Sequence, residues 1–287
     1  MLARCWGGDR TRMENVAARI RHMDQLGIDV QVVYPTIFIE QVTDKPEIEV
    51  ALCKSWDRWL ADIWQQGGTR IRWMCVLPLL SMQDALDMLP WCQEHGAVGV
   101  FMRPIEGNRL LHDPYFSPLY EKLSQLNMGV GVHVANGNPL DRDLVGQRVA
   151  WGGGFWPFLL PVVGACHAAI TSGLMAQFPK LRMGFIESSA SWVPWVIQDL
   201  RRRAEGRQLP EHFLEDFRIF VTCYITDDIP YIAKMAGAGV VMVGTDYGHT
   251  DMSVELDALR TLGEGGGINP RLARQILDDN PRAFYGL

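Results

Sequence analysis

The 287-residue sequence predicts an α/β fold, a TIM-like (β/α)8 barrel with seven recognisable strands. First, short apolar runs alternate with amphipathic helical patterns along the whole chain. Second, each connection between consecutive runs is too long for a hairpin, so the strands should be parallel. Third, polar residues stand where the runs end, which is where parallel barrels place their chemistry. A closed barrel of this type has eight strands, and the missing strand 1 would have to precede Thr11.

The strands are predicted from apolar runs of strand length that are separated by helical patterns. A long irregular stretch, Ala135 to Pro157, follows the fourth run, and its aromatic residues favour an ordered lid or pocket wall. The seven runs are 28–35, 71–79, 97–103, 129–134, 181–187, 219–224 and 240–243.

The helices are predicted from capping residues and from apolar residues at helical spacing. Thr11 and Glu14 form a capping box for the first helix, which Gly27 should end. Further helices are expected to begin at Asp44, at Ser81, near Tyr115, before His167, after Glu187, after Asp227 and at Asn269, where Pro270 takes the first helical position.

The composition indicates one domain over residues 1–287 in a reducing compartment. The chain is 48% hydrophobic and 21% charged, and its net charge of -6 with no Lys/Arg stripe argues against nucleic acid as a partner. It has six cysteines without metal-binding spacing, which are expected to be buried thiols. The sequence shows neither a signal peptide nor an apolar run of membrane-spanning length, so we expect a cytoplasmic protein.

Two residues at strand ends predict a metal site. His133 ends the fourth apolar run, and Asp246 follows the last one in the segment V-V-M-V-G-T-D-Y-G-H. Imidazole with carboxylate suits one divalent ion, Zn²⁺ or Mn²⁺. The alternatives are a core histidine bonded to backbone and an aspartate that caps the next helix.

Other polar residues are candidates for catalysis or substrate binding. Glu187 is a catalytic candidate with Asp246, because a carboxylate after M-G-F-I needs a metal, a cation or a proton as partner. Arg103 would either clamp a substrate carboxylate or pair with Glu106.

His249 and His167 are substrate-binding candidates, and His167 has the alternative of a core histidine. The histidines in polar contexts, His22, His95, His112 and His212, are expected at the surface.

The segments that carry these residues resemble the amidohydrolase-related family. G-T-D-Y-G-H is similar to its strand-eight signature, and V-G-V-H-V, F-P-K-L-R-M-G-F-I-E-S-S-A-S-W-V-P and I-L-D-D-N-P-R-A-F-Y-G-L resemble family segments in the same order. The family includes metal-dependent aromatic acid decarboxylases such as aminocarboxymuconate semialdehyde decarboxylase and γ-resorcylate decarboxylase. The resemblance implies that His133 and Asp246 are metal ligands. Glu187 stands where these decarboxylases usually have a histidine, and the His-x-His motif of strand 1 is absent.

The resemblance implies a metal-dependent carboxy-lyase or hydrolase that acts on a small carboxylated substrate, of which an aromatic acid is one candidate. The alternative is a metal-free barrel that binds a ligand or partner without catalysis. The absent first strand further predicts weakened metal affinity, and its open edges predict a homodimer or higher homo-oligomer.

Overall fold

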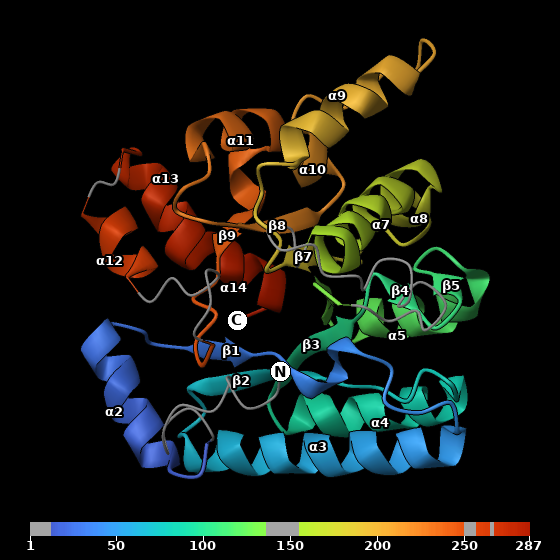
Figure 1. Cartoon of the computed structure of the whole chain (residues 1–287), viewed down its shortest axis with the longest axis vertical. Helices are drawn as coiled ribbons and strands as arrows, with labels where there is room; N and C mark the ends of the chain where they lie inside the picture. The colour runs from blue at the N-terminus through green and yellow to red at the C-terminus, as the bar shows by residue number, and fades with distance from the viewer. Residues whose placement is uncertain (1–12, 136–154, 250–256, 265–266) are drawn as a thin grey trace.

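The seven predicted strands form one curled parallel sheet. The computed structural model describes residues 13–135, 155–249, 257–264 and 267–287. Within them the sheet has the order β1-β2-β3-β6-β7-β8-β9, and every neighbouring pair is parallel (Figure 1). The strands are β1 (Gln31–Val33), β2 (Ile71–Cys75), β3 (Ala97–Met102), β6 (Gly129–His133), β7 (Met183–Ile186), β8 (Ile219–Cys223) and β9 (Val241–Val243).

The sheet is open between its first and last strands. Among the described residues β1 and β9 each pair with one neighbour only, so no strand closes the barrel there. Helix α14 (Asn280–Tyr285) lies between these two edges in Figure 1. The fold is therefore TIM-like, as predicted, with a seam where strand 1 of a closed barrel would lie.

Helices cover the outer face of this sheet (Figure 1). Helices α2 (Val16–Leu26), α3 (Pro46–Gln66) and α4 (Met82–Glu94) lie on the side of β1 to β3, and those that follow β6, apart from α14, lie on the side of β7 to β9. The remaining helices are α5 (Ser117–Gln125), α7 (Leu160–Thr171), α8 (Leu174–Gln177), α9 (Val193–Arg203), α10 (Phe213–Asp216), α11 (Ile229–Ala236), α12 (Ala258–Gly263) and α13 (Pro270–Arg274). Shorter helical turns are η2 (Ile37–Ile39), η3 (Pro114–Phe116), η4 (Phe155–Leu159), η5 (Ala238–Val240) and η6 (Gln275–Asp279).

Several predicted helix starts differ from the structure. Asn15, rather than a Thr11 box, caps α2, because its side-chain oxygen accepts a hydrogen bond from the backbone N–H of Ala18 at 2.9 Å; Thr11 lies outside the described residues. Asp44 does not cap α3, which begins with Pro46 after Lys45 and has no side-chain cap. Asn269 caps α13 as predicted.

Several elements were not predicted. A hairpin of β4 (Ile105–Glu106) and β5 (Arg109–Leu110) lies in what was expected to be a loop, α10 lies in the connection before β8, and α12 lies between the last strand and the helix that begins at Asn269. The predicted lid, Ala135 to Pro157, lies mostly outside the described residues.

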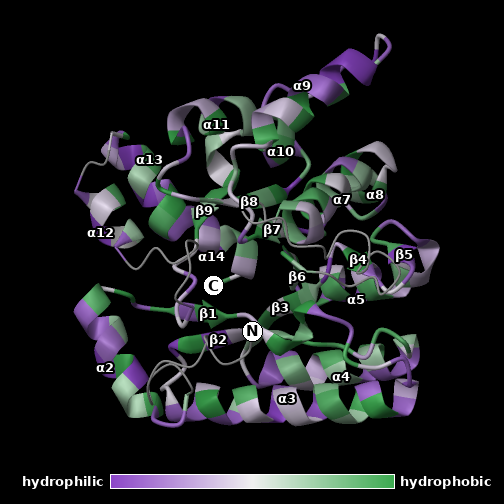
Figure 2. Ribbon diagram, in the orientation of Figure 1, coloured by the Kyte–Doolittle hydropathy of each residue, from purple (hydrophilic) through white to green (hydrophobic). Residues whose placement is uncertain are grey.

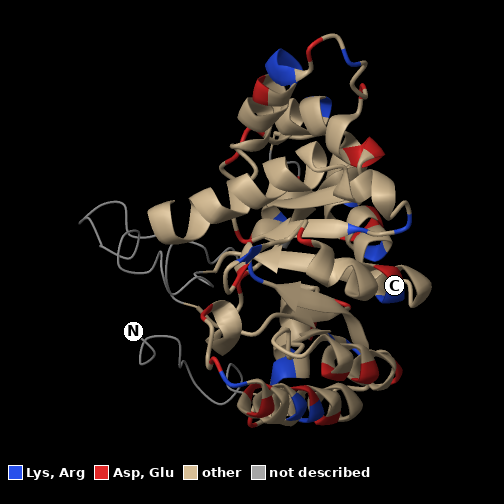
Figure 3. Ribbon diagram, turned by 90° about the vertical axis from the view of Figure 1, so that its right-hand side faces the viewer, with Lys and Arg blue, Asp and Glu red and all other residues tan. Residues whose placement is uncertain are grey.

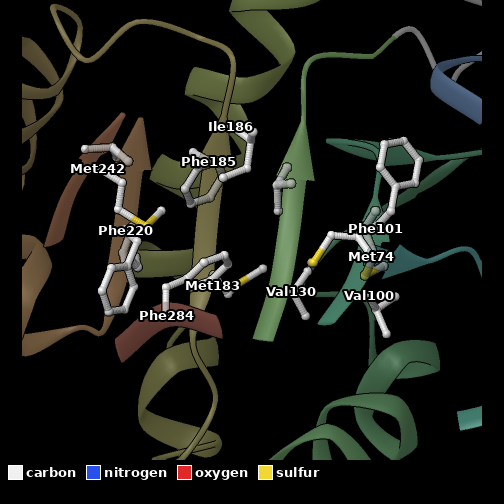
Figure 4. Packing of buried hydrophobic residues seen from close by; sticks show 14 of the residues in the cluster. Met74, Val100, Phe101, Val130, Met183, Phe185, Ile186, Phe220, Met242 and Phe284 are labelled. Carbon is white, nitrogen blue, oxygen red and sulfur yellow. The ribbon is translucent and has the colours of Figure 1, made fainter. Parts of the chain in front are cut away.

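Large side chains fill the inner face of the sheet because glycines leave room for them. A Cβ on Gly131 would lie 2.7 Å from Tyr34 Oη and 2.9 Å from Met74 Cε, and one on Gly184 would lie 2.5 Å from Phe284 Cζ. Such contacts are too short for any other residue. Figure 4 shows Phe284 of α14 beside Phe220 of β8, with ring centroids 5.2 Å apart. The base of the barrel is therefore a packed core.

Apolar and charged residues separate as the fold requires. The central strands are largely hydrophobic in Figure 2, while the charged residues in Figure 3 lie mainly on helices and loops. The basic run 201–203 ends α9, and its Arg202 and Arg203 pair with Asp199. No described helix combines the length and apolar character needed to cross a membrane. The five described cysteines are buried, as expected.

Candidate active site

The candidate site lies at the carboxyl ends of three strands. His133 is the last residue of β6, Glu187 directly follows β7, and Asp246 and His249 follow β9. Parallel register brings His133 opposite Ile186, so the backbone places Glu187 next to the histidine. The sequence therefore located these groups correctly on one edge of the sheet.

His133 and Glu187 form a partly buried ion pair. Their Nε2 and Oε2 atoms are 2.7 Å apart, and the other ring nitrogen, Nδ1, donates to the carbonyl oxygen of Val134 at 2.9 Å. Burial by itself lowers the pKa of His133, but the charge and hydrogen bond of Glu187 outweigh it, with a smaller contribution from Asp246, so that the pKa is raised. Because Nδ1 donates to a carbonyl oxygen, the 2.7 Å contact between His133 Nε2 and Glu187 Oε2 requires a shared proton.

Glu187, Asp246 and His249 form a cluster of potential metal ligands. One side-chain donor atom of each lies within 4.8 Å of the others. Asp246 Oδ2 accepts a hydrogen bond from His249 Nδ1 at 2.9 Å. Two carboxylates and an imidazole are the donor set expected for a borderline or hard divalent ion. The set differs from the predicted His133–Asp246 pair, and His133 joins it through Glu187.

Two residues of the site, Glu187 and Asp246, have strained backbone conformations. Glu187 (φ 59°) and Asp246 (φ 44°) are both in the left-handed region, which is uncommon for residues other than Gly and concentrates at functional sites. The hydroxyl of Thr222 accepts a hydrogen bond from Glu187 N at 2.8 Å, and Tyr224 Oη donates to Glu187 O at 3.4 Å. Strand β8 thereby fixes the conformation that turns the Glu187 carboxylate into the site.

The loop after Glu187 is anchored by one carboxylate. Asp227 accepts hydrogen bonds from the hydroxyls of Ser189 (2.7 Å) and Ser191 (2.5 Å) and from the backbone N–H of Ala190 (2.9 Å). It also accepts from Tyr224 N at 2.9 Å. The loops after β7 and β8 are therefore one hydrogen-bonded unit.

Side chains from the N-terminal part of the chain hold the Asp246 loop across the seam. Tyr247 Oη lies 2.5 Å from His22 Nδ1, and the guanidinium of Arg19 stacks 3.2 Å from the centroid of the Tyr247 ring. Thr36 Oγ1 is 3.5 Å from His249 Nε2. The expectation that His22 is a surface residue was wrong, because helix α2 turns it toward Tyr247. The sequence signal for this was that His22 lies three residues after Arg19, so that both side chains share one face of the predicted helix.

Two aromatic rings lie beside His133. Its ring centroid lies 5.4 Å from that of Tyr34 and 5.8 Å from that of Phe101. Tyr34 Oη is 3.0 Å from Tyr285 Oη, which ties β1 to α14 across the seam. Burial, together with Tyr285, raises the pKa of Tyr34 well above its usual value, so Tyr34 is a neutral hydroxyl.

The family model described as Amidohydrolase matches residues 6–287. The chain belongs to the amidohydrolase family. The resemblance predicted from the sequence is thus confirmed over almost the whole length of the chain.

Solved structures support the fold of this amidohydrolase. An amidohydrolase from Mycobacterium avium subsp. paratuberculosis K-10 has a TM-score of 0.75 and 24% identity, with 95% of this chain and 74% of that chain covered. The 2,6-dihydroxybenzoate (γ-resorcylate) decarboxylase from Rhizobium has a TM-score of 0.77 and 18% identity, with 93% and 87% covered. A dihydroxybenzoic acid decarboxylase from Polaromonas sp. JS666, solved with manganese and 2-nitroresorcinol, has a TM-score of 0.77 and 19% identity, with 94% and 85% covered.

Arg103 of this amidohydrolase is bound within the protein. Its Nε donates to Glu106 Oε2 at 2.9 Å, its Nη2 contacts the same oxygen, and its Nη1 donates to the carbonyl oxygens of both Phe38 and Glu40 at 3.2 Å. This is the second of the two roles predicted from the sequence. Since four contacts already occupy the guanidinium, the arrangement argues against Arg103 as a substrate clamp.

His167 also has a partner outside the site. On α7, its Nε2 lies 3.5 Å from Asp199 Oδ2 of α9, and the same oxygen accepts from Arg203 at 2.6 Å. The contact joins two outer helices. A substrate-binding role for His167 stays a prediction without support from this geometry.

Proposed function

We propose that this amidohydrolase is a metal-dependent decarboxylase of small aromatic carboxylates. The proposal rests on the cluster of Glu187, Asp246 and His249 beside the His133–Glu187 pair, with donor atoms close enough to share one ion. Relatives of the same fold support the reaction class, because two of them are decarboxylases of dihydroxybenzoates and one was solved with manganese.

The donor set fits a divalent cation such as Mn²⁺ or Zn²⁺. Glu187, Asp246 and His249 would hold it, in place of the hydrogen bond from His249 to Asp246. When bound, the ion supplies Lewis-acid stabilisation for the substrate carboxylate and a neighbouring oxygen.

The protein residues supply the proton and the surroundings of the ring. In decarboxylation the ring carbon gains a proton while the carbon–carbon bond to the carboxylate breaks and CO₂ leaves. The proton between His133 Nε2 and Glu187 Oε2 stands at the site and is the proposed source. The rings of Tyr34 and Phe101 form an apolar wall around His133 that suits an aromatic substrate.

The test is CO₂ release by the purified full chain with a panel of hydroxybenzoates, together with its metal content. We expect one divalent ion per chain and CO₂ from at least one aromatic acid, both abolished by Asp246→Asn. Hydrolysis of lactones or amides without CO₂ release would replace this proposal with the hydrolase alternative. A chain that holds no metal and turns over neither class of substrate would be a ligand-binding module, and the proposal would be wrong.

A further inference from the structure

A second group of potential metal ligands lies on the opposite side of the sheet from the inner core. Asp57 of α3, Cys75 at the end of β2 and Cys92 of α4 are all completely buried, and one donor atom of each lies within 4.8 Å of the others. Met74 packs onto Gly99 and Gly131 on the inner face, so its neighbour Cys75 points outward, toward α3 and α4. Three separate elements thus converge on one point in the helix layer.

We infer that Asp57, Cys75 and Cys92 form a binding site for a thiophilic divalent cation of the zinc and cadmium class. Metal–sulfur bonds of about 2.3 Å and metal–oxygen bonds of about 2.0–2.2 Å place the ligand atoms of one ion about 3.5–4 Å apart. The observed separations therefore need little adjustment. The proposed active-site cluster holds no thiol among its described members, so the two sites differ in the metals they favour.

The carboxylate of Asp57 is already oriented for such a role. Its Oδ1 accepts a hydrogen bond from Val76 N at 3.1 Å, and its Oδ2 accepts one from Cys92 Sγ at 3.4 Å. The hydrogen bond from the backbone N–H of Val76 can hold Oδ1 while Oδ2 binds the metal. Carboxylates that bind metals are usually oriented by such hydrogen bonds. Cys53, one helical turn before Asp57 and buried, interacts electrostatically with Asp57 and Cys75 and is a candidate for a fourth ligand.

Metal binding would exchange protons for the cation. Two S–H bonds and one O–H bond break, two metal–sulfur bonds and one metal–oxygen bond form, and three protons pass to solvent with no change of oxidation state. The site would change from neutral to a net charge of -1. Burial raises the pKa of the Cys75 thiol, so protons compete with the metal and affinity should rise steeply with pH.

The test is titration of the reduced, metal-free full chain with Cd²⁺, followed by thiolate-to-cadmium charge-transfer absorption and by proton release. We expect one absorbing Cd²⁺ per chain, about three protons released per ion, and a higher melting temperature. Cys75→Ser and Cys92→Ser should each reduce the affinity at least tenfold, while Cys166→Ser, a buried thiol on α7, should leave it unchanged. Circular dichroism and a cooperative melt check that each variant folds, and Cys92→Ala replaces a serine variant that does not.

Absence of the charge-transfer band from the wild-type protein would overturn the inference. So would a band that persists in both serine variants, because it would then arise from other cysteines. In either case the cluster is a hydrogen-bonded packing contact and nothing more.

Discussion

Replacing Asp57 with Asn should change how stability depends on pH. Asp57 has no exposed surface, and desolvation raises its pKa to about 8 although Val76 N–H and the Cys92 thiol hydrogen-bond to it. In the unfolded chain an aspartate has a pKa of about 3.9. The folded protein therefore binds a proton here that the unfolded chain has already released, throughout the window between these two values.

The sign follows from this difference in proton binding. The stability that protonated Asp57 contributes is fully present below the unfolded pKa and is lost as pH rises toward the folded pKa. Each pH unit inside the window is worth about 1.4 kcal/mol, so from pH 5 to pH 8 the wild-type protein should lose about 4 kcal/mol relative to Asp57→Asn. In Asp57→Asn the side-chain oxygen still accepts the hydrogen bond from Val76 N–H, but the new N–H groups have only weak acceptors. This should lower the variant's free energy of unfolding by about 1 kcal/mol at low pH.

The assay is urea unfolding of both chelator-treated proteins across pH 5 to 8. The difference in their free energies of unfolding should change sign within this range, in favour of the variant at the higher pH. Asp199→Asn is the matched control: the hydrogen bond from Arg203 holds the pKa of Asp199 below its usual value, so its contribution changes only at more acidic pH. Parallel curves for wild type and Asp57→Asn would show that Asp57 is ionised in the folded protein and refute the reasoning.

Three further predictions concern the site and the core. Glu187→Gln should abolish turnover but cost only about 1–2 kcal/mol of stability, since the amide can still bond to His133; full activity would remove Glu187 from the mechanism. Phe284→Ala should destabilise by about 3–5 kcal/mol in urea unfolding, against little change for the half-exposed Phe155→Ala, and equal effects would contradict the packed core. Tyr247→Phe, which removes the hydroxyl bonded to His22, should lower kcat more than it raises KM, whereas unchanged kinetics would show that this contact does not position Asp246.

The sheet could be predicted from the sequence because its strands are buried on both faces. A run such as Val130 to His133 is apolar at almost every position, and local composition alone identifies it as a strand. Parallel strands then end on one edge, so the order of elements was sufficient to bring His133, Glu187 and Asp246 together.

What could not be predicted depends on partners distant in sequence. His22 reads as a surface residue until α2 meets Tyr247. Arg103 had two predicted roles, and only the hairpin at 105–110 and the carbonyl oxygens of Phe38 and Glu40 decide in favour of its pairing with Glu106. The predicted cap of the first helix was wrong for a local reason: Asn15 and Thr11 are both good capping residues, and residue type alone does not decide which of them begins α2. Asp57 reads as one more polar residue on an amphipathic helix, because the thiols that surround it come from other elements.

The seam has a consequence for how the protein folds. Its contacts join residues 225 positions apart (His22 and Tyr247), 251 apart (Tyr34 and Tyr285) and 213 apart (Thr36 and His249). Contacts with such large sequence separation form slowly, because the chain between them must be ordered first. The reactive groups therefore come together only after these distant segments have met, late in folding. The same contacts should be among the first to open in the native protein, so that amide hydrogen exchange in α2 is faster than in the central strands.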